Sequence, residues 1–253
     1  MAKVSYSIKW TNEFTEDFIN DFIRVENEIL YGGQFTRDLF NLKYCEDIYG
    51  QSVLIVAYCD EKAVGSYALW RNDIDGKEAY QSVDSCVIQE YQGLLIFPEM
   101  INKLKAQVPK ECPIYGFPNS EATPIVKLMK HKILGTYRTR FLFSYRIFHK
   151  EHQTLIPYDY AKWWIINYDK SIYSTKIGSH LFLVKKHKTK GTLFVVGEVN
   201  EETAALFPKI SGLFIPTYYS SVPTFYNKNK KGIIIVNQRN IYADIPTWKV
   251  DAV

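Results

Sequence analysis

The chain has 253 residues, of which 47% are hydrophobic and 15% aromatic, and its formal net charge at pH 7 is +4. A chain of this length and apolar content can form one large or two small folded domains, which excludes a disordered protein. Its apolar stretches are far shorter than the ~20 residues that span a bilayer, and no signal-peptide pattern opens the sequence. We therefore expect a cytoplasmic protein with no membrane span.

The cysteine and lysine patterns narrow the kinds of site further. The four cysteines are widely spread and contain no CxxC pair, which predicts reduced thiols rather than a zinc site or a disulfide framework. We expect no metal site. The densest basic runs, at residues 185–190 and 228–231, fit hairpin tips, where lysine blunts strand edges. We therefore expect no nucleic-acid partner.

The first ninety residues predict a strand, two helices and a meander. Alternation predicts the first strand at residues 4–10. A helix follows, capped by Thr11 or Thr15, and a shorter amphipathic segment begins at Thr36. The Asp75-Gly76 pair predicts a hairpin turn. The meander strands are expected at residues 52–59, 63–74 and 77–88.

The next sixty residues predict two more helices and two more strands. Pro98 is expected as the first residue of a helix, and residues 113–117 as a short strand. A second helix, capped by Thr123, is expected to end at Gly135, and a long strand to follow at residues 136–148. The order β-α-α-β-β-β-α-β-α-β predicts an α/β (α+β) fold, with a mixed sheet and helices on both of its faces.

The rest of the chain predicts a smaller α+β half. A polar connection at residues 149–157 precedes it. The expected elements are a helix at 158–168, a hairpin at 179–185 and 192–199, a helix at 201–210, and strands at 212–219 and 232–237. A hairpin, helix and strand thus recur without a residue-level repeat. We predict a domain at residues 1–150 and a smaller half at 151–253, which can be a degenerate second copy.

The strand that ends near residue 88 leads into Tyr91 and the run Gln92-Gly93-Leu94-Leu95-Ile96-Phe97, and a helix follows directly. This arrangement resembles the GNAT superfamily of N-acyltransferases, and the resemblance covers roughly residues 1–150. In that family a loop Q/R-x-x-G-x-G/A and the next helix hold the pyrophosphate of acyl-CoA through backbone N–H groups and the positive helix end. Here Leu95 and Phe97 stand where the family has small residues.

The resemblance implies acetyl-CoA as a co-substrate. The run Tyr115-Gly116-Phe117-Pro118-Asn119 resembles the family's fifth strand, after which an asparagine contacts the cofactor arm; an ordinary turn is the alternative. The residues implied to bind acetyl-CoA are Val87, Ile88, Gln92, Gly93, Leu94, Leu95, Ile96, Phe97 and Asn119.

Two residues are candidates for proton transfer. His131 lies four residues before Gly135, where many family members have a tyrosine that protonates the departing thiolate; a surface histidine near a helix end is the alternative. Asp84 lies inside the polar strand segment that precedes the loop. A polar run in a central strand costs stability unless it lines a cavity, so Asp84 is the candidate base; a strand residue that faces solvent is the alternative.

Acceptor-binding residues follow from the resemblance. Acceptors in the family enter near the end of the first helix, which makes Glu26 and Glu28 candidates, although either can be a solvated helix residue. Trp163 and Trp164, together with Tyr218, are implied to complete the acceptor pocket. An aromatic core is the alternative.

These patterns lead to one expected function and two alternatives. The expected function is an acyl-CoA-dependent N-acyltransferase, an enzyme that transfers an acyl group, expected to be acetyl, to a small amine. Two-part members of the family imply an amino sugar, often nucleotide-linked, of bacterial surface polysaccharide as the acceptor. The alternatives are a non-catalytic GNAT-like binding module and a relative of the peptidoglycan aminoacyl transferases. The sequence leaves the oligomeric state open.

Overall fold

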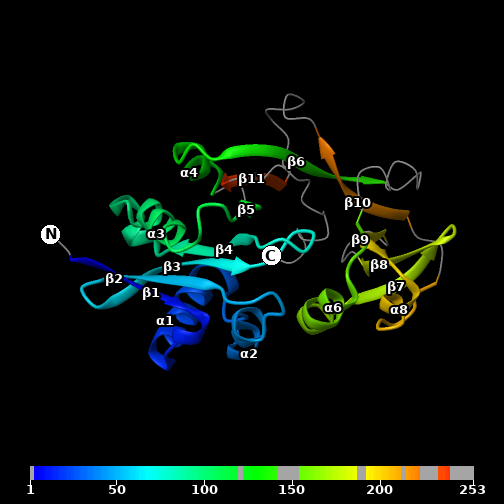
Figure 1. Cartoon of the computed structure of the whole chain (residues 1–253), viewed down its shortest axis with the longest axis horizontal. Coiled ribbons are helices and arrows are strands. Elements are labelled where there is room, and N and C mark those ends of the chain that lie inside the picture. The colour runs from blue at the N-terminus through cyan, green and yellow to red at the C-terminus, as the bar shows by residue number, and fades with distance from the viewer. Residues whose placement is uncertain are drawn as a thin grey trace. The chain divides into compact units, whose positions relative to one another are not determined.

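The computed structural model describes residues 3–118, 122–141, 154–186, 192–211, 215–222 and 233–239. The chain forms two compact units (Figure 1). The first contains residues 3–117, 122–132 and 236–239, and the second contains residue 118 and the described residues from 133 to 235. The boundary predicted between residues 150 and 151 lies outside the described residues. No helix in the described ranges is long and apolar enough to cross a membrane.

The first unit is built around a mixed sheet, as the sequence predicts. Its strands lie in the order β1-β2-β3-β4-β5-β11. Strands β1 to β4 pair antiparallel, β4 pairs parallel with β5, and β5 pairs antiparallel with β11. The strands span Val4–Trp10 (β1), Val53–Cys59 (β2), Lys62–Arg71 (β3), Tyr80–Val87 (β4), Ile114–Gly116 (β5) and Ile233–Arg239 (β11).

Helices cover both faces of this sheet, with α1 and α2 on one face and α3 on the other (Figure 1). The predicted caps Thr15 and Thr36 are confirmed, since they accept the N–H groups of Phe18 at 3.4 Å and Leu39 at 3.2 Å. The helical elements are η1 (Thr11–Glu13), α1 (Glu16–Glu26), η2 (Asn27–Tyr31), α2 (Arg37–Phe40), η3 (Asn41–Cys45), η4 (Gln89–Leu94), α3 (Ile96–Lys105) and α4 (Thr123–Leu128). Both η2 and η3 are π-helical turns.

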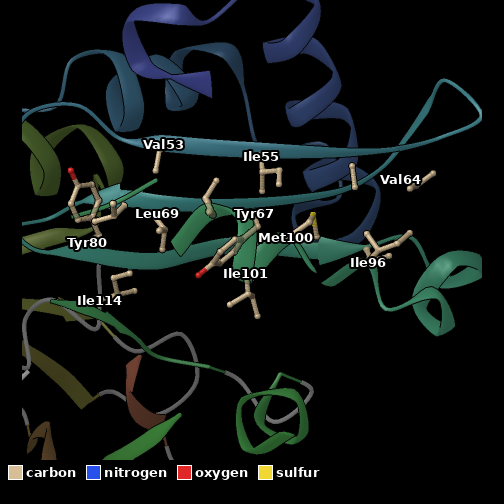
Figure 2. Close-up of a cluster of buried hydrophobic side chains, with 14 of the residues drawn as sticks. Val53, Ile55, Val64, Tyr67, Leu69, Tyr80, Ile96, Met100, Ile101 and Ile114 are labelled. Atoms are coloured by element: carbon tan, nitrogen blue, oxygen red, sulfur yellow. The ribbon is translucent and has the colours of Figure 1, made fainter. Parts of the chain in front are cut away.

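The core between α3 and the sheet holds the two in register. Figure 2 shows Ile96, Met100 and Ile101 of α3 beside Tyr67 and Leu69 of β3. Each of these side chains is at most 3% exposed. Burying a large apolar side chain contributes about 1.5–3 kcal/mol, so this layer fixes where α3 begins relative to the end of β4.

In the first unit, the start of α3 and the end of α4 differ from the prediction. Helix α3 begins at Ile96 rather than at Pro98, because Ile96 is buried in the core and starts the helix two residues earlier. Helix α4 ends at Leu128 rather than near Gly135. Lys130 adopts a left-handed φ of 55°, and the His131 N–H reaches back to the Val126 carbonyl at 3.1 Å. This C-terminal motif stops the helix, and strand β6 (Lys132–Phe141) begins directly after it.

The strands of the second unit lie in the order β6-β10-β9-β8-β7. Strand β10 is antiparallel to β6 and parallel to β9, while β7, β8 and β9 form an antiparallel meander. The helix predicted at 158–168 and the hairpin are confirmed, whereas the helix predicted at 201–210 ends at Ala204. Strand β7 was not predicted, because an edge strand with polar residues carries a weak signal. The elements span Tyr158–Tyr160 (α6), Ala161–Ile165 (η5), Ile166–Tyr168 (α7), Ile172–Ile177 (β7), His180–Lys186 (β8), Thr192–Val199 (β9), Glu201–Ala204 (α8) and Ile215–Val222 (β10).

The two units share an order of elements. In the first, the meander β2-β3-β4 leads through α3 to β5, which is parallel to β4. In the second, the meander β7-β8-β9 leads through α8 to β10, which is parallel to β9. That the second unit is a degenerate copy of the first stays a prediction, which this shared order supports.

Strands β4 and β5 separate soon after they pair. Their last pair is Ser82 with Gly116, and β4 then continues to Val87 whereas β5 ends. A Cβ atom on Gly116 would lie 3.1 Å from the Ser82 Cβ and 3.2 Å from its carbonyl oxygen. Glycine therefore fits without strain at the point where the two strands begin to open, whereas a side chain there would press on Ser82.

We predict that Gly116→Ala destabilises the fold by about 1–3 kcal/mol, because the added methyl group overpacks the last β4–β5 pair. Gly93→Ala is the matched control, since a Cβ atom there would meet no atom within 4 Å. Chemical denaturation followed by circular dichroism measures both. Equal stability of the two variants would contradict the close approach.

Candidate functional site

A β-bulge in β4 turns a carboxylate toward the helices. Between the pairs Ala68–Val83 and Ser66–Cys86, β3 advances by two residues and β4 by three, so β4 carries one extra residue. Asp84 lies in this stretch with a left-handed φ of 43°. The extra residue reverses the alternation of side chains, which places Asp84 and Cys86 on the same face as α1. Aspartate tolerates this conformation better than most residues.

Asp84 is surrounded by hydrogen-bond donors from the two π-helical turns. Its Oδ1 accepts the Tyr31 hydroxyl of η2 at 2.7 Å and Lys43 Nζ of η3 at 3.2 Å. Its Oδ2 lies 3.0 Å from Lys43 Nζ and accepts the Tyr44 hydroxyl. The side chains of Lys43 and Asp84 are 3% and 1% exposed. The charge of Asp84 is therefore fully compensated inside the protein.

Aromatic rings enclose this ion pair. Lys43 Nζ lies 5.1 Å from the Trp70 ring centroid and 5.7 Å from that of Tyr44. Burial and the negative charge of Asp84 raise the pKa of Tyr44 well above its usual value. Tyr44 therefore keeps its proton and remains a hydrogen-bond donor to Asp84.

Glu26, at the end of α1, is a second buried carboxyl on the same face. Its Oε1 accepts the Ser66 hydroxyl at 2.6 Å and lies 3.6 Å from the Cys86 sulfur. Its Oε2 is buried and has no hydrogen-bond partner among the described residues. Burial and then the charge of Asp84 raise the pKa of Glu26 to about 8. Glu26 is therefore mostly protonated at neutral pH.

The loop that carries the predicted phosphate-binding run directly follows β4. The Gln92 amide donates to the Val87 carbonyl at 3.1 Å, which ties the loop to the end of the strand. Leu95 takes a left-handed φ of 56°, and its side chain is 65% exposed. Phe97 packs against the core, with its ring centroid 6.3 Å from that of Tyr67. No side chain caps this end of α3.

His131 lies in the chain between α4 and β6. Both of its ring nitrogens are buried without a hydrogen-bond partner in the described structure. Burial, and then the charge of Lys105, lower the pKa of His131 to about 4. The imidazole is therefore uncharged at neutral pH. No hydrogen bond or ion pair among the described residues joins His131 to Asp84, and its role as proton donor stays a prediction.

The remaining predicted site residues fall into two groups. Glu28 is 43% exposed at its side chain and pairs with Arg24 at 3.4 Å on the surface of the helix. Trp163 and Trp164 are 8% and 2% exposed, and their rings lie 5.5 Å apart in the second unit. Asn119 and the Tyr218 side chain lie outside what the structure describes. No group of three or more metal-ligating side chains occurs in the described ranges.

The sequence predictions omitted the partners of both carboxyls: Tyr31, Lys43, Tyr44, Ser66 and Cys86. A signal for two of them was present, because Lys43 and Tyr44 follow the buried Phe40 by three and four residues and share its side of the helix. For Glu26 the signal was the spacing i, i+4, i+8 from Phe18 and Phe22, which places it on the buried stripe.

We predict a pH-dependent stability that originates at Glu26. Its pKa is raised from 4.5 to about 8 in the folded protein, so the folded state binds this proton more tightly than the unfolded state. The stabilisation is complete below pH 4.5 and is lost as pH rises to about 8. The wild-type protein should therefore lose stability relative to Glu26→Gln across this window, as measured by urea denaturation. Glu28→Gln is the exposed control, and a pH-independent difference for Glu26→Gln would contradict the burial.

The buried Lys43–Asp84 pair should show strong coupling. Lys43→Met or Asp84→Asn alone leaves an unpaired buried polar or charged group, and each should cost about 3–5 kcal/mol. The double variant should cost clearly less than the sum of the two. Arg37→Met, which breaks an exposed pair with Glu16, should change stability by about 1 kcal/mol or less. Additive effects in a double-mutant cycle would show that Lys43 and Asp84 do not depend on each other.

Comparison with known proteins shows the fold. No protein-family model matches the sequence, and no curated protein matches it significantly. A GCN5-related N-acetyltransferase from Kribbella flavida superposes with a TM-score of 0.51 at 12% identity, over 91% of this chain and 71% of that chain. ElaA from Escherichia coli gives a TM-score of 0.44 at 10% identity, over 54% of this chain and 92% of its own.

An acyl-CoA N-acyltransferase from Pseudomonas aeruginosa gives a TM-score of 0.43 at 8% identity, over 54% of this chain and 91% of that chain. Only the Kribbella flavida comparison has a TM-score above 0.5 among these three, and at 12% identity it speaks for the fold rather than for a substrate. This chain therefore shares the mixed α+β fold of that N-acetyltransferase.

Proposed function

We propose that the protein is an acyl-CoA-dependent N-acyltransferase that transfers an acyl group, expected to be acetyl, to a primary amine on a small acceptor. The observation that carries this proposal is the opening between β4 and β5 beyond the Ser82–Gly116 pair. In sheets with parallel strands, ligands bind in the crevice beyond the carboxyl ends of neighbouring strands that separate there. The segment from Val83 to Val87 has no β5 partner among the described residues, so its free edge can pair with the amides of a pantetheine arm.

The loop after β4 supports binding of the pyrophosphate. A left-handed residue between two right-handed turns points successive N–H groups toward one side, which forms an anion-binding concavity. Leu95 is such a residue, between η4 and α3. The N–H groups of Ile96 and Phe97 add the donors of an uncapped helix start. Because the Phe97 ring packs into the core, it does not compete for this surface.

The left-handed backbone conformation of Leu95 is strained, and this strain supports a ligand-binding role for the loop. The conformation costs roughly 1–2 kcal/mol for a residue with a side chain. Such strain persists where the surrounding structure imposes it, most often at ligand sites. Leu95 thus provides the backbone direction that glycine provides in the family's usual loop, at a cost in stability.

The chemistry asked of the protein is positioning and proton transfer. Acyl-CoA supplies an activated carbonyl carbon and a thiolate leaving group. The protein must present the acceptor nitrogen without its extra proton and stabilise the charge that develops on the carbonyl oxygen. The buried carboxyls next to the bulge in β4 provide groups for the first task. His131 stays a predicted proton donor to the leaving thiolate.

The acceptor class is the least constrained part of the proposal. We propose a small amine, and an amino sugar of bacterial surface polysaccharide rests on resemblance alone. The burial of Trp163 and Trp164 favours a packing role for these two residues, so the proposal of an amine acceptor does not depend on them. The four unpaired cysteines support a cytoplasmic location, where thiols remain reduced.

A non-catalytic binding module is the second candidate. Leu95 and Phe97 favour it, because they replace the small residues of the resembling loop. The two candidates differ in whether thiol is released from acetyl-CoA when an amine is present. A relative of the peptidoglycan aminoacyl transferases remains within the transferases and would show no such release with acetyl-CoA.

We predict that acetyl-CoA raises the melting temperature, because a ligand at a hundred times its Kd stabilises the folded state by about 2.7 kcal/mol. Leu95→Asp should weaken the binding of acetyl-CoA by at least about fivefold, since a carboxylate at a helix start opposes an anion by ~1 kcal/mol. Leu95→Asn is the matched control, because asparagine also tolerates the left-handed conformation but is uncharged.

Isothermal calorimetry with acetyl-CoA and with pantetheine separates the contributions. The Leu95→Asp variant should lose affinity for acetyl-CoA but not for pantetheine, which lacks the pyrophosphate. The absence of any melting shift with acetyl-CoA, free CoA and longer acyl-CoAs would overturn the proposed function.

A further inference from the structure

The two buried carboxyls on the α1 face differ in how their oxygens are used. Both oxygens of Asp84 are occupied by Tyr31, Lys43 and Tyr44. A carboxylate held in this way has little capacity to accept another proton donor. In Glu26, Oε1 accepts a hydrogen bond from Ser66, whereas the buried Oε2 has no hydrogen-bond partner among the described residues. A buried polar atom without a partner is costly, which points to a partner that arrives with a ligand.

The charge balance around Glu26 allows one additional positive charge. Lys43 provides the single positive charge that compensates Asp84. Cys86 and Tyr44 remain protonated beside these groups, because burial and then neighbouring carboxyl groups raise the pKa of each. The cluster is therefore neutral while Glu26 keeps its proton. Ionised Glu26 would give it one uncompensated negative charge, which a primary ammonium would balance.

Glu26 also lies against the stretch of β4 that has no β5 neighbour. Ser66 and Cys86, which contact its Oε1, form the first β3–β4 pair beyond the bulge. Cys86 lies between Val83 and Val87, the part of β4 that is open on its β5 side. Glu26 thus faces the same strand segment that the proposed function assigns to the acyl-CoA arm.

We propose that Glu26, rather than Asp84, accepts the proton of the acceptor ammonium, and that Asp84 acts as a fixed anion that holds Lys43, Tyr31 and Tyr44 in place. This inference rests on the proposed N-acyltransferase function and names the proton acceptor for it. The chemical class it selects is a primary amine that arrives as a cation.

The step balances as follows. Ionised Glu26 takes one proton from the ammonium, and the nitrogen lone pair then forms a bond with the thioester carbon. The C–S bond breaks as the carbonyl re-forms, and CoA leaves as a thiolate. The second nitrogen proton goes to that thiolate, so the products are an amide, CoA thiol and protonated Glu26. Loss of this proton to solvent returns Glu26 to its starting state.

The first test is the pH dependence of acetyl transfer by the full chain. The release of CoA thiol from acetyl-CoA is measured with spermidine and glucosamine as probe amines. The pH range runs from about 6 to about 9.5, so that it includes values below and above the pKa of the proposed base. The wild-type rate should rise with a midpoint near pH 8, where Glu26 ionises. Glu26→Gln should lower the rate by about 10²–10⁴-fold and abolish the rise, while the melting shift with acetyl-CoA persists.

Two further variants should move the midpoint in opposite directions, which a purely structural role would not do. Ser66→Ala removes a hydrogen bond that lowers the pKa of Glu26, so the midpoint should move to higher pH. Asp84→Asn removes a negative charge that raises this pKa, so the midpoint should move to lower pH. Unchanged rates in Glu26→Gln, or an unchanged midpoint in Ser66→Ala, would overturn the inference and leave the proposed function standing.

A second readout does not depend on turnover. The infrared C=O band of protonated Glu26, assigned by its absence in Glu26→Gln, should weaken as pH rises through 8 and when spermidine is added at pH 7. A band that does not respond to spermidine would overturn the inference, whether or not spermidine is acetylated. If the band responds but acetyl-CoA causes no melting shift and releases no thiol, the proposed function is overturned. The proposed proton transfer during acylation is then overturned as well.

Discussion

The extra residue in β4 is the constraint on which the rest of the site depends. Without it, strict alternation would direct Asp84 and Cys86 to the α3 face, into the apolar layer around Tyr67 and Met100. The bulge instead places them against α1 and the two π-helical turns, where Lys43 and the tyrosines compensate Asp84. It lies within the part of β4, from Val83 to Val87, that β5 leaves unpaired. One backbone irregularity therefore orients the polar cluster, and it lies on the strand segment where we propose that the pantetheine arm binds.

The sequence predicted most of the elements, because local signals determined them. Alternation predicted β1, the Asp75-Gly76 turn signal predicted a hairpin of the meander, and threonine caps predicted the starts of α1 and α2. Boundaries were wrong where tertiary contacts outweighed local preference: Ile96 extends α3 into the core, and the left-handed Lys130 ends α4 before Gly135. The pairing of β11 with β5 joins residues that lie more than a hundred positions apart. No local pattern specifies such a contact.

The candidate site was predicted in part. Asp84 was predicted because a polar residue in a central strand costs stability unless it lines a cavity. The bulge that orients Asp84 could not be predicted, because it depends on the register between β4 and β3. Its surroundings could not be predicted, since Tyr31 and Lys43 come from separate turns that converge only in the folded chain. The charge state of Glu26 depends on burial and on Asp84, and both are properties of the fold. Leu95 differs in residue type from the small residue of the resembling loop, and its left-handed φ of 56° could not be predicted from the sequence.

We propose that the open edge of β4 beyond Ser82 receives the pantetheine arm of acyl-CoA. The most direct measurement is the change in backbone amide chemical shifts when pantetheine and then acetyl-CoA are added to the isotopically labelled chain. The chemical shifts of the amides between Val83 and Val87 should change with both ligands. Those of Leu95, Ile96 and Phe97 should change with acetyl-CoA alone. Responses confined to other segments, or no response in β4, would contradict it.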